Sequence, residues 1–162
     1  MAELRSFEPT DTPLIRALLA AIGWEAQYIE GQAASVSALH GDPNARVVVA
    51  PAGPALAGFV SVAFAPWNRL GQVHGLAVAP AQQRRGIASA LLGAAEAFVR
   101  EQCGRGVFVD TPVDNHTARA FYAANGYQAA YVMPEYYAEG LDGVTYLKLF
   151  GRKTTPPSGD GR

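Results

Sequence analysis

The central part of the sequence has the pattern of a βαβ unit, and this feature constrains the fold more than any other. Residues 72–79 form an apolar run with alternating character that Pro80 ends. A helical pattern opens at Gly86, and residues 107–109 then predict the next strand. Two strands joined through a helix run parallel in one sheet. We therefore predict an α/β (α+β) fold whose sheet contains a parallel pair.

The flanking segments predict further strands and helices. Asp11 is a candidate N-cap and Gly23 a candidate helix end, while Asp114 or Asn115 caps a later helix that Gly126 ends. The pattern favours six to seven strands and about four helices, in a mixed, mostly antiparallel sheet. The expected strands are residues 4–7, 46–50, 56–64, 72–79, 107–109, 127–132 and 144–150, with a loop containing Glu135-Tyr136-Tyr137 between the last two; the expected helices are residues 11–22, 28–39, 86–103 and 114–125.

The composition fits one domain and excludes several classes of protein. The chain has 162 residues, 49% of them hydrophobic, which suffices for one core and excludes global disorder. Its 13 basic and 14 acidic side chains give a net charge of −1, so binding of nucleic acid through a basic face is not expected. We expect a single domain over residues 1–150. Residues 151–162 include no side chain able to join a core, and we expect a disordered tail there.

The sequence also predicts where the protein resides. The single cysteine, Cys103, cannot form an intrachain disulfide, which favours a reducing compartment. The first eight residues carry three charges and lack the apolar segment of a signal peptide, and no apolar run reaches the roughly 18 residues that a membrane span needs. We expect a cytoplasmic protein that does not contact membranes.

The segment Gln83-Arg84-Arg85-Gly86-Ile87-Ala88 joins the first strand of the βαβ unit to its helix. The start of a helix presents unpaired N–H groups and the positive end of the helix dipole. Gly86 and Ala88 allow an anion to approach closely, and two arginines add charge. The segment predicts a phosphate or pyrophosphate site, although small residues at this position could also serve only packing. The sequence lacks the Gly-Lys-Ser/Thr of a P-loop and the G-x-G-x-x-G of a dinucleotide site.

Several motifs together resemble those of the GNAT superfamily of acyl-CoA N-acyltransferases. The chain has Gln/Arg-x-x-Gly-x-Gly/Ala after a strand, then Asn-x-x-Ala-x-x-x-Tyr, then Gly-Tyr. The order of strands and helices over residues 4–150 is also similar to the GNAT fold. The resemblance implies a central sheet whose two parallel strands splay apart to admit acetyl-CoA, with no metal. The matching residues are Gln83, Gly86 and Ala88, then Asn115, Ala118 and Tyr122, then Gly126 and Tyr127.

The resemblance implies which residues bind the acetyl-CoA co-substrate. Backbone groups of the strand before the loop would hold the pantetheine arm and the acetyl carbonyl, and the N–H groups after it would hold the pyrophosphate. Asn115 looks like the residue that hydrogen-bonds the pantetheine arm, and Tyr122 looks like the phenol that contacts and protonates the departing thiolate. Besides Asn115 and Tyr122, the expected acetyl-CoA-binding residues are Leu76, Ala77, Val78, Gln83, Arg84, Arg85, Gly86, Ile87, Ala88 and Ser89.

Amide formation from a thioester is helped by a base that deprotonates the amine and by an acid that protonates the departing thiolate. The attacking amine must be neutral although a lysine-like amine has a pKa near 10, so a base or a desolvated site must remove its proton. Tyr122 suits the acid, while a half-buried aromatic of the core is the alternative. Asp110 occupies the place of an acidic residue in family members that acetylate protein N-termini, but Thr111 and Pro112 depart from their pattern. His74 is the rival base, expected on the same face as Leu76 and Val78. A water relay without a dedicated base is the third alternative.

The sequence gives less information about the acceptor pocket than about the acetyl-CoA site. Tyr136 and Tyr137 resemble the paired tyrosines of ribosomal-protein N-terminal acetyltransferases, and Trp24, Tyr28 and Trp67 lie where this family borders its acceptor. The expected function is acetyl transfer from acetyl-CoA to a primary amine: a protein N-terminus, a lysine or a small molecule. A non-catalytic acyl-CoA sensor is the alternative. Dimers are frequent in the family, so the resemblance also allows a homodimer.

Overall fold

A seven-stranded mixed sheet runs through residues 3–151, the part of the chain that the computed structural model describes. The strand order is β1-β2-β3-β4-β5-β7-β6, and β4 with β5 is the parallel pair among otherwise antiparallel neighbours. The α+β fold expected from the sequence is thus confirmed, whereas the expected tail after residue 151 lies outside the described residues. The strands are Arg5–Ser6 (β1), Ala45–Ala52 (β2), Ala55–Ala65 (β3), Leu70–Val78 (β4), Gly106–Pro112 (β5), Gln128–Ala138 (β6) and Leu141–Leu149 (β7).

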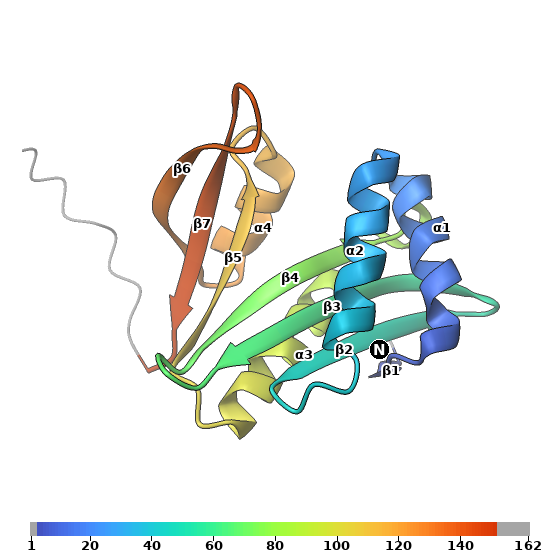
Figure 1. Ribbon diagram of the computed structural model, residues 1–162, viewed down its shortest axis with the longest axis horizontal. Helices are drawn as coiled ribbons and strands as arrows, with labels where there is room; N and C mark the ends of the chain where they lie inside the picture. Colours follow the sequence, from blue (N-terminus) through green and yellow to red (C-terminus); the bar gives the residue numbers. More distant parts are fainter. Residues whose placement is uncertain (1–2, 152–162) are drawn as a thin grey trace, which may run out of the picture.

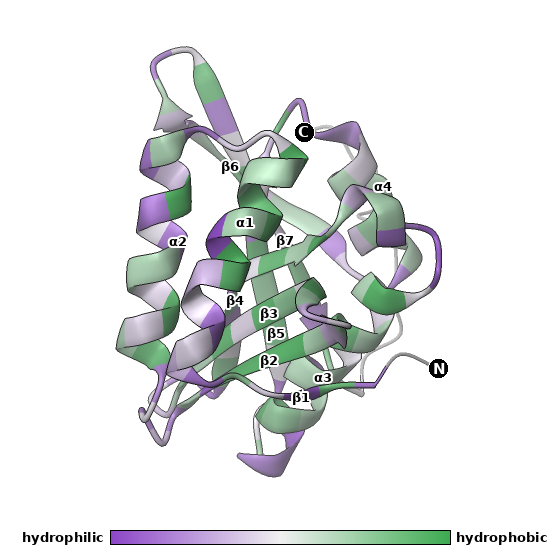
Figure 2. Ribbon diagram, turned by 90° about the vertical axis from the view of Figure 1, so that its right-hand side faces the viewer, coloured by the Kyte–Doolittle hydropathy of each residue, from purple (hydrophilic) through white to green (hydrophobic). Residues whose placement is uncertain are grey.

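Helices cover both faces of the sheet. α1 and α2 lie on one face, and α3 and α4 lie on the other (Figures 1 and 2). In Figure 2 the strands between these two layers are largely hydrophobic, while the outer helix surfaces carry hydrophilic residues. The described helices are Thr12–Ile22 (α1), Ala26–Leu39 (α2), Ile87–Glu101 (α3) and His116–Ala124 (α4), with 3₁₀ turns at Pro9–Asp11 and Pro80–Gln82.

Each face of the sheet has its own hydrophobic core. Leu91, Phe98 and Val99 of α3 pack with Val60 and Val107 of the sheet. On the opposite face, α1 and α2 bury a second cluster against β2 and β3, which consists of Phe7, Ile15, Leu18, Leu19, Val36, Val47, Val49, Leu56, Phe59 and Ala77. Burial on two faces explains why β3 reads as a nearly continuous apolar run rather than an alternating one.

The helix ends follow the sequence signals with one exception. Gly23 and Gly126 adopt the left-handed conformation after α1 and α4, with φ of 101° and 88°. Asn115 caps α4, because its side-chain oxygen accepts a hydrogen bond of 3.1 Å from the Ala118 N–H. The side chain of Asp11 does not cap α1. A 3₁₀ turn precedes the helix, and the Asp11 carboxylate instead accepts two 2.8 Å hydrogen bonds from Arg5.

The hairpin of β6 and β7 is longer than the sequence predicts. The expected loop around Glu135 belongs to β6, which continues to Ala138 as a bulged segment. Glu135 adopts a φ of +51°, its N–H donates to Asp142 Oδ1 at 2.9 Å, and its carboxylate accepts from the Gly140 N–H at 3.0 Å. These side-chain contacts hold the irregular segment against β7. The sequence did not predict this extension of β6, because it depends on contacts between residues of the two strands and not on local turn signals.

The glycine at the start of β5 is required by packing, which predicts a large effect of a small substitution. A Cβ at Gly106 would lie 2.5 Å from the Lys148 carbonyl oxygen and 3.0 Å from the Leu149 side chain. We expect Gly106→Ala to lower the free energy of unfolding by about 1–3 kcal/mol, because the backbone of β7 cannot move freely. The control Gly93→Ala, in open space on α3, should raise it by up to about 1 kcal/mol. Urea unfolding measures both, and equal midpoints would contradict this explanation.

Candidate active site

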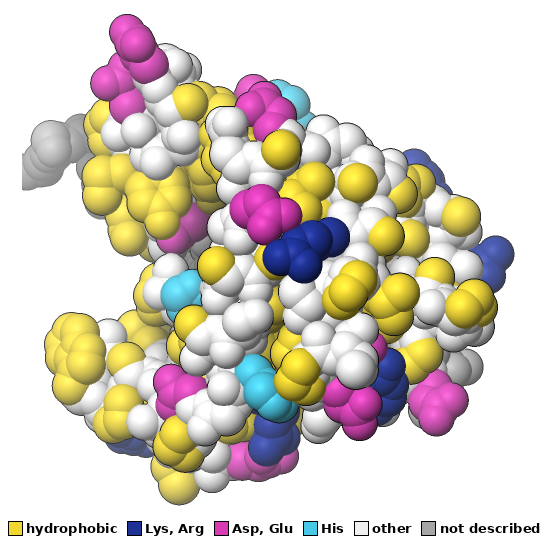
Figure 3. Space-filling view, turned by 45° about the vertical axis from the view of Figure 1, so that its right-hand side comes forward, with side chains coloured by type: hydrophobic (Ala, Val, Ile, Leu, Met, Phe, Trp, Pro, Cys, Tyr) yellow, Lys and Arg dark blue, Asp and Glu magenta, His cyan; other side chains and the backbone are white. Residues whose placement is uncertain are grey.

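A cleft opens where the two parallel strands part. Cα partners join β4 to β5 only from Leu70↔Gly106 to Val73↔Val109. Beyond these pairs, β4 stays with β3 and β5 stays with β7, so the ends of β4 and β5 diverge (Figure 1). Figure 3 shows the molecule hollowed between the lobe formed by β6 and β7 and the rest of the domain. Unpaired strand edges in such a cleft offer backbone donors and acceptors to a ligand.

A β-bulge lies in β4 at the point of divergence. Val73 pairs with Val62 and Gly75 pairs with Ser61, so His74 is an extra residue without a partner on β3. The prediction that His74 shares a face with Leu76 and Val78 is therefore wrong. Those two side chains pack against the α3 core, whereas His74 is exposed. A bulge shifts the side-chain alternation of a strand by one residue, and the sequence did not mark it.

Asp110 is the first residue of β5 beyond the parallel ladder, and it faces several titratable groups. Thr145 of β7 is its Cα partner, and the buried Thr145 hydroxyl donates a hydrogen bond to Asp110 Oδ1. Burial raises the pKa of Tyr136 and Tyr137, and the Asp110 charge raises both further. Partial desolvation lowers the pKa of His74, and the Asp110 charge opposes this shift. Asp110 thus lies close to both the rival base His74 and the two tyrosines predicted for the acceptor pocket.

The Asp110–Thr145 hydrogen bond predicts a role for Thr145 that sequence reasoning missed. Thr145→Val keeps the shape of the side chain but leaves Asp110 Oδ1 without its buried donor. We expect kcat to fall on the order of 10-fold, because hydrogen bonds to charged groups are worth more than neutral ones. Thr145→Ser keeps a hydroxyl and is the matched control. Equal kcat in both variants would show that this hydroxyl does not orient Asp110 for the reaction.

Tyr122 projects from α4 into the core beside the cleft. Its side chain is 6% exposed, and its ring lies 5.9 Å from that of Tyr146 and 5.8 Å from that of Tyr127, measured between centroids. Burial raises the pKa of Tyr122, so its hydroxyl keeps its proton at neutral pH. A protonated phenol can donate to a departing thiolate. The aromatic core packing that was the alternative to catalysis is also present, and the two roles are compatible.

Asn115 is also fixed by α4. Its Oδ1 accepts the capping hydrogen bond from the Ala118 N–H. The NH₂ group of this exposed side chain is therefore the part able to reach a ligand. An amide NH₂ donates hydrogen bonds, which suits the carbonyl groups of a pantetheine arm.

The loop before α3 has the geometry of an anion site. Gly86 is the N-cap, with a φ of +77°, and nothing lies within 4 Å of an ideal Cβ there. Packing therefore does not explain the glycine. No side chain caps α3, and the first ladder bond runs from the Ala90 N–H to the Gly86 carbonyl at 3.0 Å. The N–H groups of the first turn, residues 87–89, are thus free for a phosphate oxygen.

The side chains around this loop add to its positive potential. Arg84 and Arg85 are exposed, and Ser89 is exposed within the first turn of the helix. Arg84 is itself held at a φ of +63°, which bends the loop before Gly86. Gln83 Nε2 donates a long hydrogen bond of 3.5 Å to the Val78 carbonyl, which ties the loop back to the end of β4. Leu76 and Val78 of β4 turn their side chains to the α3 core, so the cleft meets the backbone of this strand.

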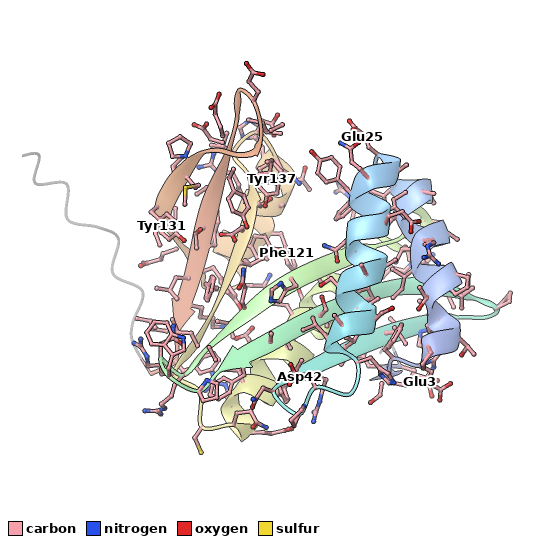
Figure 4. All side chains as sticks on the ribbon, viewed as in Figure 1. Glu3, Glu25, Asp42, Phe121, Tyr131 and Tyr137 are labelled. Carbon is pink, nitrogen blue, oxygen red and sulfur yellow. The ribbon has the colours of Figure 1, made fainter. Side chains whose placement is uncertain are left out.

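The candidate acceptor residues separate into two groups. The Tyr28 hydroxyl of α2 donates to the Tyr137 carbonyl at 3.4 Å, and the rings of Tyr136 and Tyr137 lie 4.9 Å apart, edge to face. Figure 4 shows Tyr137 on the side of the hairpin that faces α2, away from the outer edge that carries Tyr131. The three tyrosines thus form one group that joins α2 to the β6–β7 hairpin.

Trp24 and Trp67 have other surroundings. Trp24 packs against the α1–α2 core. Trp67 is 86% exposed in the turn between β3 and β4, next to Leu70, whose partner Gly106 marks the closed end of the parallel pair. A turn at that end lies about 13 Å from the bulge, at 3.3 Å per strand residue. A role of Trp67 at the acceptor pocket stays a prediction.

Comparison with known proteins agrees with this geometry. The sequence profile of the acetyltransferase (GNAT) family matches residues 15–127, and the chain belongs to this family. The fold is similar to that of a GNAT-family acetyltransferase from Desulfovibrio desulfuricans, with a TM-score of 0.79 and 24% identity over 92% of this chain and 99% of that one. A search of curated proteins found no match.

Two solved structures with assigned substrates have the same fold. The ribosomal-protein-S18-alanine N-acetyltransferase of Escherichia coli aligns with a TM-score of 0.75 and 17% identity over 98% of each chain. An aminoglycoside 6′-acetyltransferase of type Ii aligns with a TM-score of 0.77 and 20% identity over 94% of this chain and 99% of that one. The family match makes the protein a GNAT acetyltransferase that depends on acetyl-CoA. The two neighbours are named for different acceptors, a ribosomal protein and an aminoglycoside.

Membrane-spanning helices and clusters of metal ligands were also considered for the described residues. None of the helices in residues 3–151 combines the length and apolar character needed to cross a bilayer. Across the same residues, no three His, Cys, Asp or Glu side chains gather as they would around a metal ion.

Proposed function

We propose that the protein transfers the acetyl group of acetyl-CoA to a primary amine by direct attack within a ternary complex. The observation that carries this proposal is the coupling of His74 and Asp110 at the point where β4 and β5 part, with Tyr122 of α4 packed against Tyr146, the β7 partner of Val109. The amine nitrogen forms a bond to the acetyl carbon, the C–S bond breaks, the amine proton goes to a base of the cleft, and the CoA thiolate takes a proton from Tyr122.

The binding of acetyl-CoA would use the C-terminal end of β4 and the loop that follows it. The N–H groups of residues 87–89, with Arg84 and Arg85, would hold the pyrophosphate, while the backbone of residues 76–78 and the Asn115 NH₂ would hold the pantetheine arm. The open space around Gly86 supports this placement, because a phosphate can approach the N–H groups without displacing a side chain.

A peptide or protein N-terminus is the acceptor that the cleft favours. Tyr28, Tyr136 and Tyr137 meet at the side of the cleft away from the phosphate loop, and the Asp110 charge acts on two of them. Aromatic faces beside a carboxylate attract an ammonium group before it loses its proton. A chain that follows the ammonium group could leave along the hairpin.

Release of free CoA thiol in the presence of a panel of primary amines tests the proposal. Peptides with a free N-terminus should release thiol, whereas the same peptides with a blocked N-terminus and no lysine should not. Binding of acetyl-CoA without turnover over a broad panel would instead identify an acyl-CoA sensor with a GNAT fold.

The pH dependence of kcat/KM distinguishes the candidate bases. The pKa of His74 lies below its ordinary value near 6.5, so the imidazole is neutral and able to accept a proton at pH 7. If it is the base, kcat/KM rises with pH below about 6.5, and His74→Ala removes that rise. Asp110 raises the pKa of His74, so Asp110→Asn should move the inflection to lower pH. A variant with an unchanged rate and profile eliminates that residue, and two such variants favour the water relay.

A further inference from the structure

Helix α2 touches both walls of the cleft through two side chains one turn apart. Tyr28 and Gln32 lie four residues apart and therefore share one face of the helix. Tyr28 donates to the Tyr137 carbonyl on the β6 side, and Gln32 Nε2 donates to the His74 carbonyl on the β4 side at 2.9 Å. The second contact joins the helix to the bulge at which β4 leaves β5.

The bulge needs an external contact to fix its orientation. His74 has no Cα partner on β3, and the pairing with β5 ends at Val73. The Gln32 amide gives this carbonyl a hydrogen bond from outside the sheet. Because the peptide unit is planar, holding the His74 carbonyl fixes the whole unit that joins His74 to Gly75.

The local packing accommodates this contact at a cost. A Cβ at residue 75 would overlap Gln32 Oε1 and lie 3.1 Å from the Phe59 ring, so a glycine is needed for the amide to approach. Gln32 Oε1 is itself buried without a hydrogen-bond partner among the described residues. An unsatisfied buried acceptor destabilises a fold. Stability alone therefore does not explain why a glutamine occupies this position.

We propose that Gln32 is a positioning residue for acetyl transfer, which holds the His74–Gly75 peptide unit in the orientation in which the β4 wall receives the acetyl group. This inference rests on the proposed function. The donors that stabilise a developing oxyanion act only when they are already aimed at it, and small displacements of the reacting groups cost large factors in rate. Gln32 reaches the backbone of the wall and acts through it.

The first test compares two substitutions on the same helix. Gln32→Met preserves the length of the side chain and removes the donor, and Gln27→Met makes the same chemical change at an exposed position. We expect Gln32→Met to lower kcat on the order of 10-fold while the Kd for acetyl-CoA changes by less than about 2-fold, since the pyrophosphate loop is remote from α2. Gln27→Met should match the wild type. An unchanged kcat in Gln32→Met would overturn the inference.

The second test has a readout that a merely structural role would not move. In Gln32→Glu, an ionised carboxylate repels the His74 carbonyl, whereas a protonated carboxyl group donates to it. The kcat of the variant relative to wild type should therefore recover as the pH falls toward about 5. A ratio that stays constant with pH would contradict the proposal.

Two further measurements keep the test independent of folding and of the acceptor. If Gln32→Met fails to fold, Gly75→Ala displaces the same amide from the opposite side and should lower kcat in the same way. Hydrogen exchange of the amides of residues 74–76 should be faster in Gln32→Met than in wild type, whatever amine is supplied. A wild-type protein that acetylates no amine refutes the proposed function. An active wild type with an equally active Gln32→Met, or with unchanged exchange, refutes only the role of Gln32.

Discussion

Gly86→Glu is expected to weaken acetyl-CoA binding on the order of 10²-fold or more. The new side chain would stand over the N–H groups of residues 87–89 and place a negative charge where the pyrophosphate approaches. It would also have to adopt a φ of +77°, which side chains rarely do. Calorimetric titration with acetyl-CoA, or with CoA, measures the loss directly.

Two control variants separate the causes of this loss. Gly86→Asn keeps the loop neutral and tolerates the left-handed conformation, so it should lose much less affinity. Gly93→Glu introduces the same charge two turns further along α3, at an exposed position with no neighbour within 4 Å, and should bind normally. If acetyl-CoA binds Gly86→Glu as tightly as wild type, the phosphate site does not lie at this loop.

Tyr122→Phe is expected to lower kcat on the order of 10²-fold or more while acetyl-CoA affinity stays largely intact. The substitution removes the proton that the departing thiolate would take and leaves the ring in the core. Because burial raises the pKa of Tyr122, the wild-type hydroxyl stays protonated across the working range of pH. Pre-steady-state turnover with a saturating amine gives the chemical rate.

The matched control for Tyr122 is Tyr127→Phe, which removes another buried hydroxyl from the same core. It should leave kcat close to wild type, since nothing places that hydroxyl at the thiolate. A Tyr122→Phe variant with unchanged turnover would remove Tyr122 from the catalytic residues. An equal loss in both variants would indicate that packing of the tyrosine cluster, not proton transfer, controls the rate.

The sequence predicted the framework of the fold because that framework depends on local signals. Apolar runs, glycine helix ends and the strand–loop–helix–strand order locate β4, α3 and β5, and a helix connection between two strands makes them parallel. The bulge at His74 left no such signal. An extra residue in one strand is defined only against its partner, and Ser61 and Val62 of β3 lie more than ten residues away.

The candidate site was predictable where one segment carries its own chemistry. The phosphate loop, Asn115 and Tyr122 each follow from a local motif. Gln32 and Thr145 do not, because each acts on a residue 42 or 35 positions away, and a lone amide or hydroxyl belongs to no pattern. Trp67 was assigned to the acceptor pocket from the family resemblance alone; it lies in the turn at the closed end of the parallel pair, and its role stays a prediction.

Mass spectrometry of products from a mixed pool of peptides and small amines tests the central claim most directly. With acetyl-CoA and wild-type protein, we predict peptides that have gained one acetyl group on the α-amine, in amounts equal to the CoA released, and far less product with Tyr122→Phe. Products confined to small amines would confirm acetyl transfer but assign a different acceptor. Acetyl-CoA binding with no acetylated product from any amine in the pool would contradict the claim that this cleft catalyses acetyl transfer.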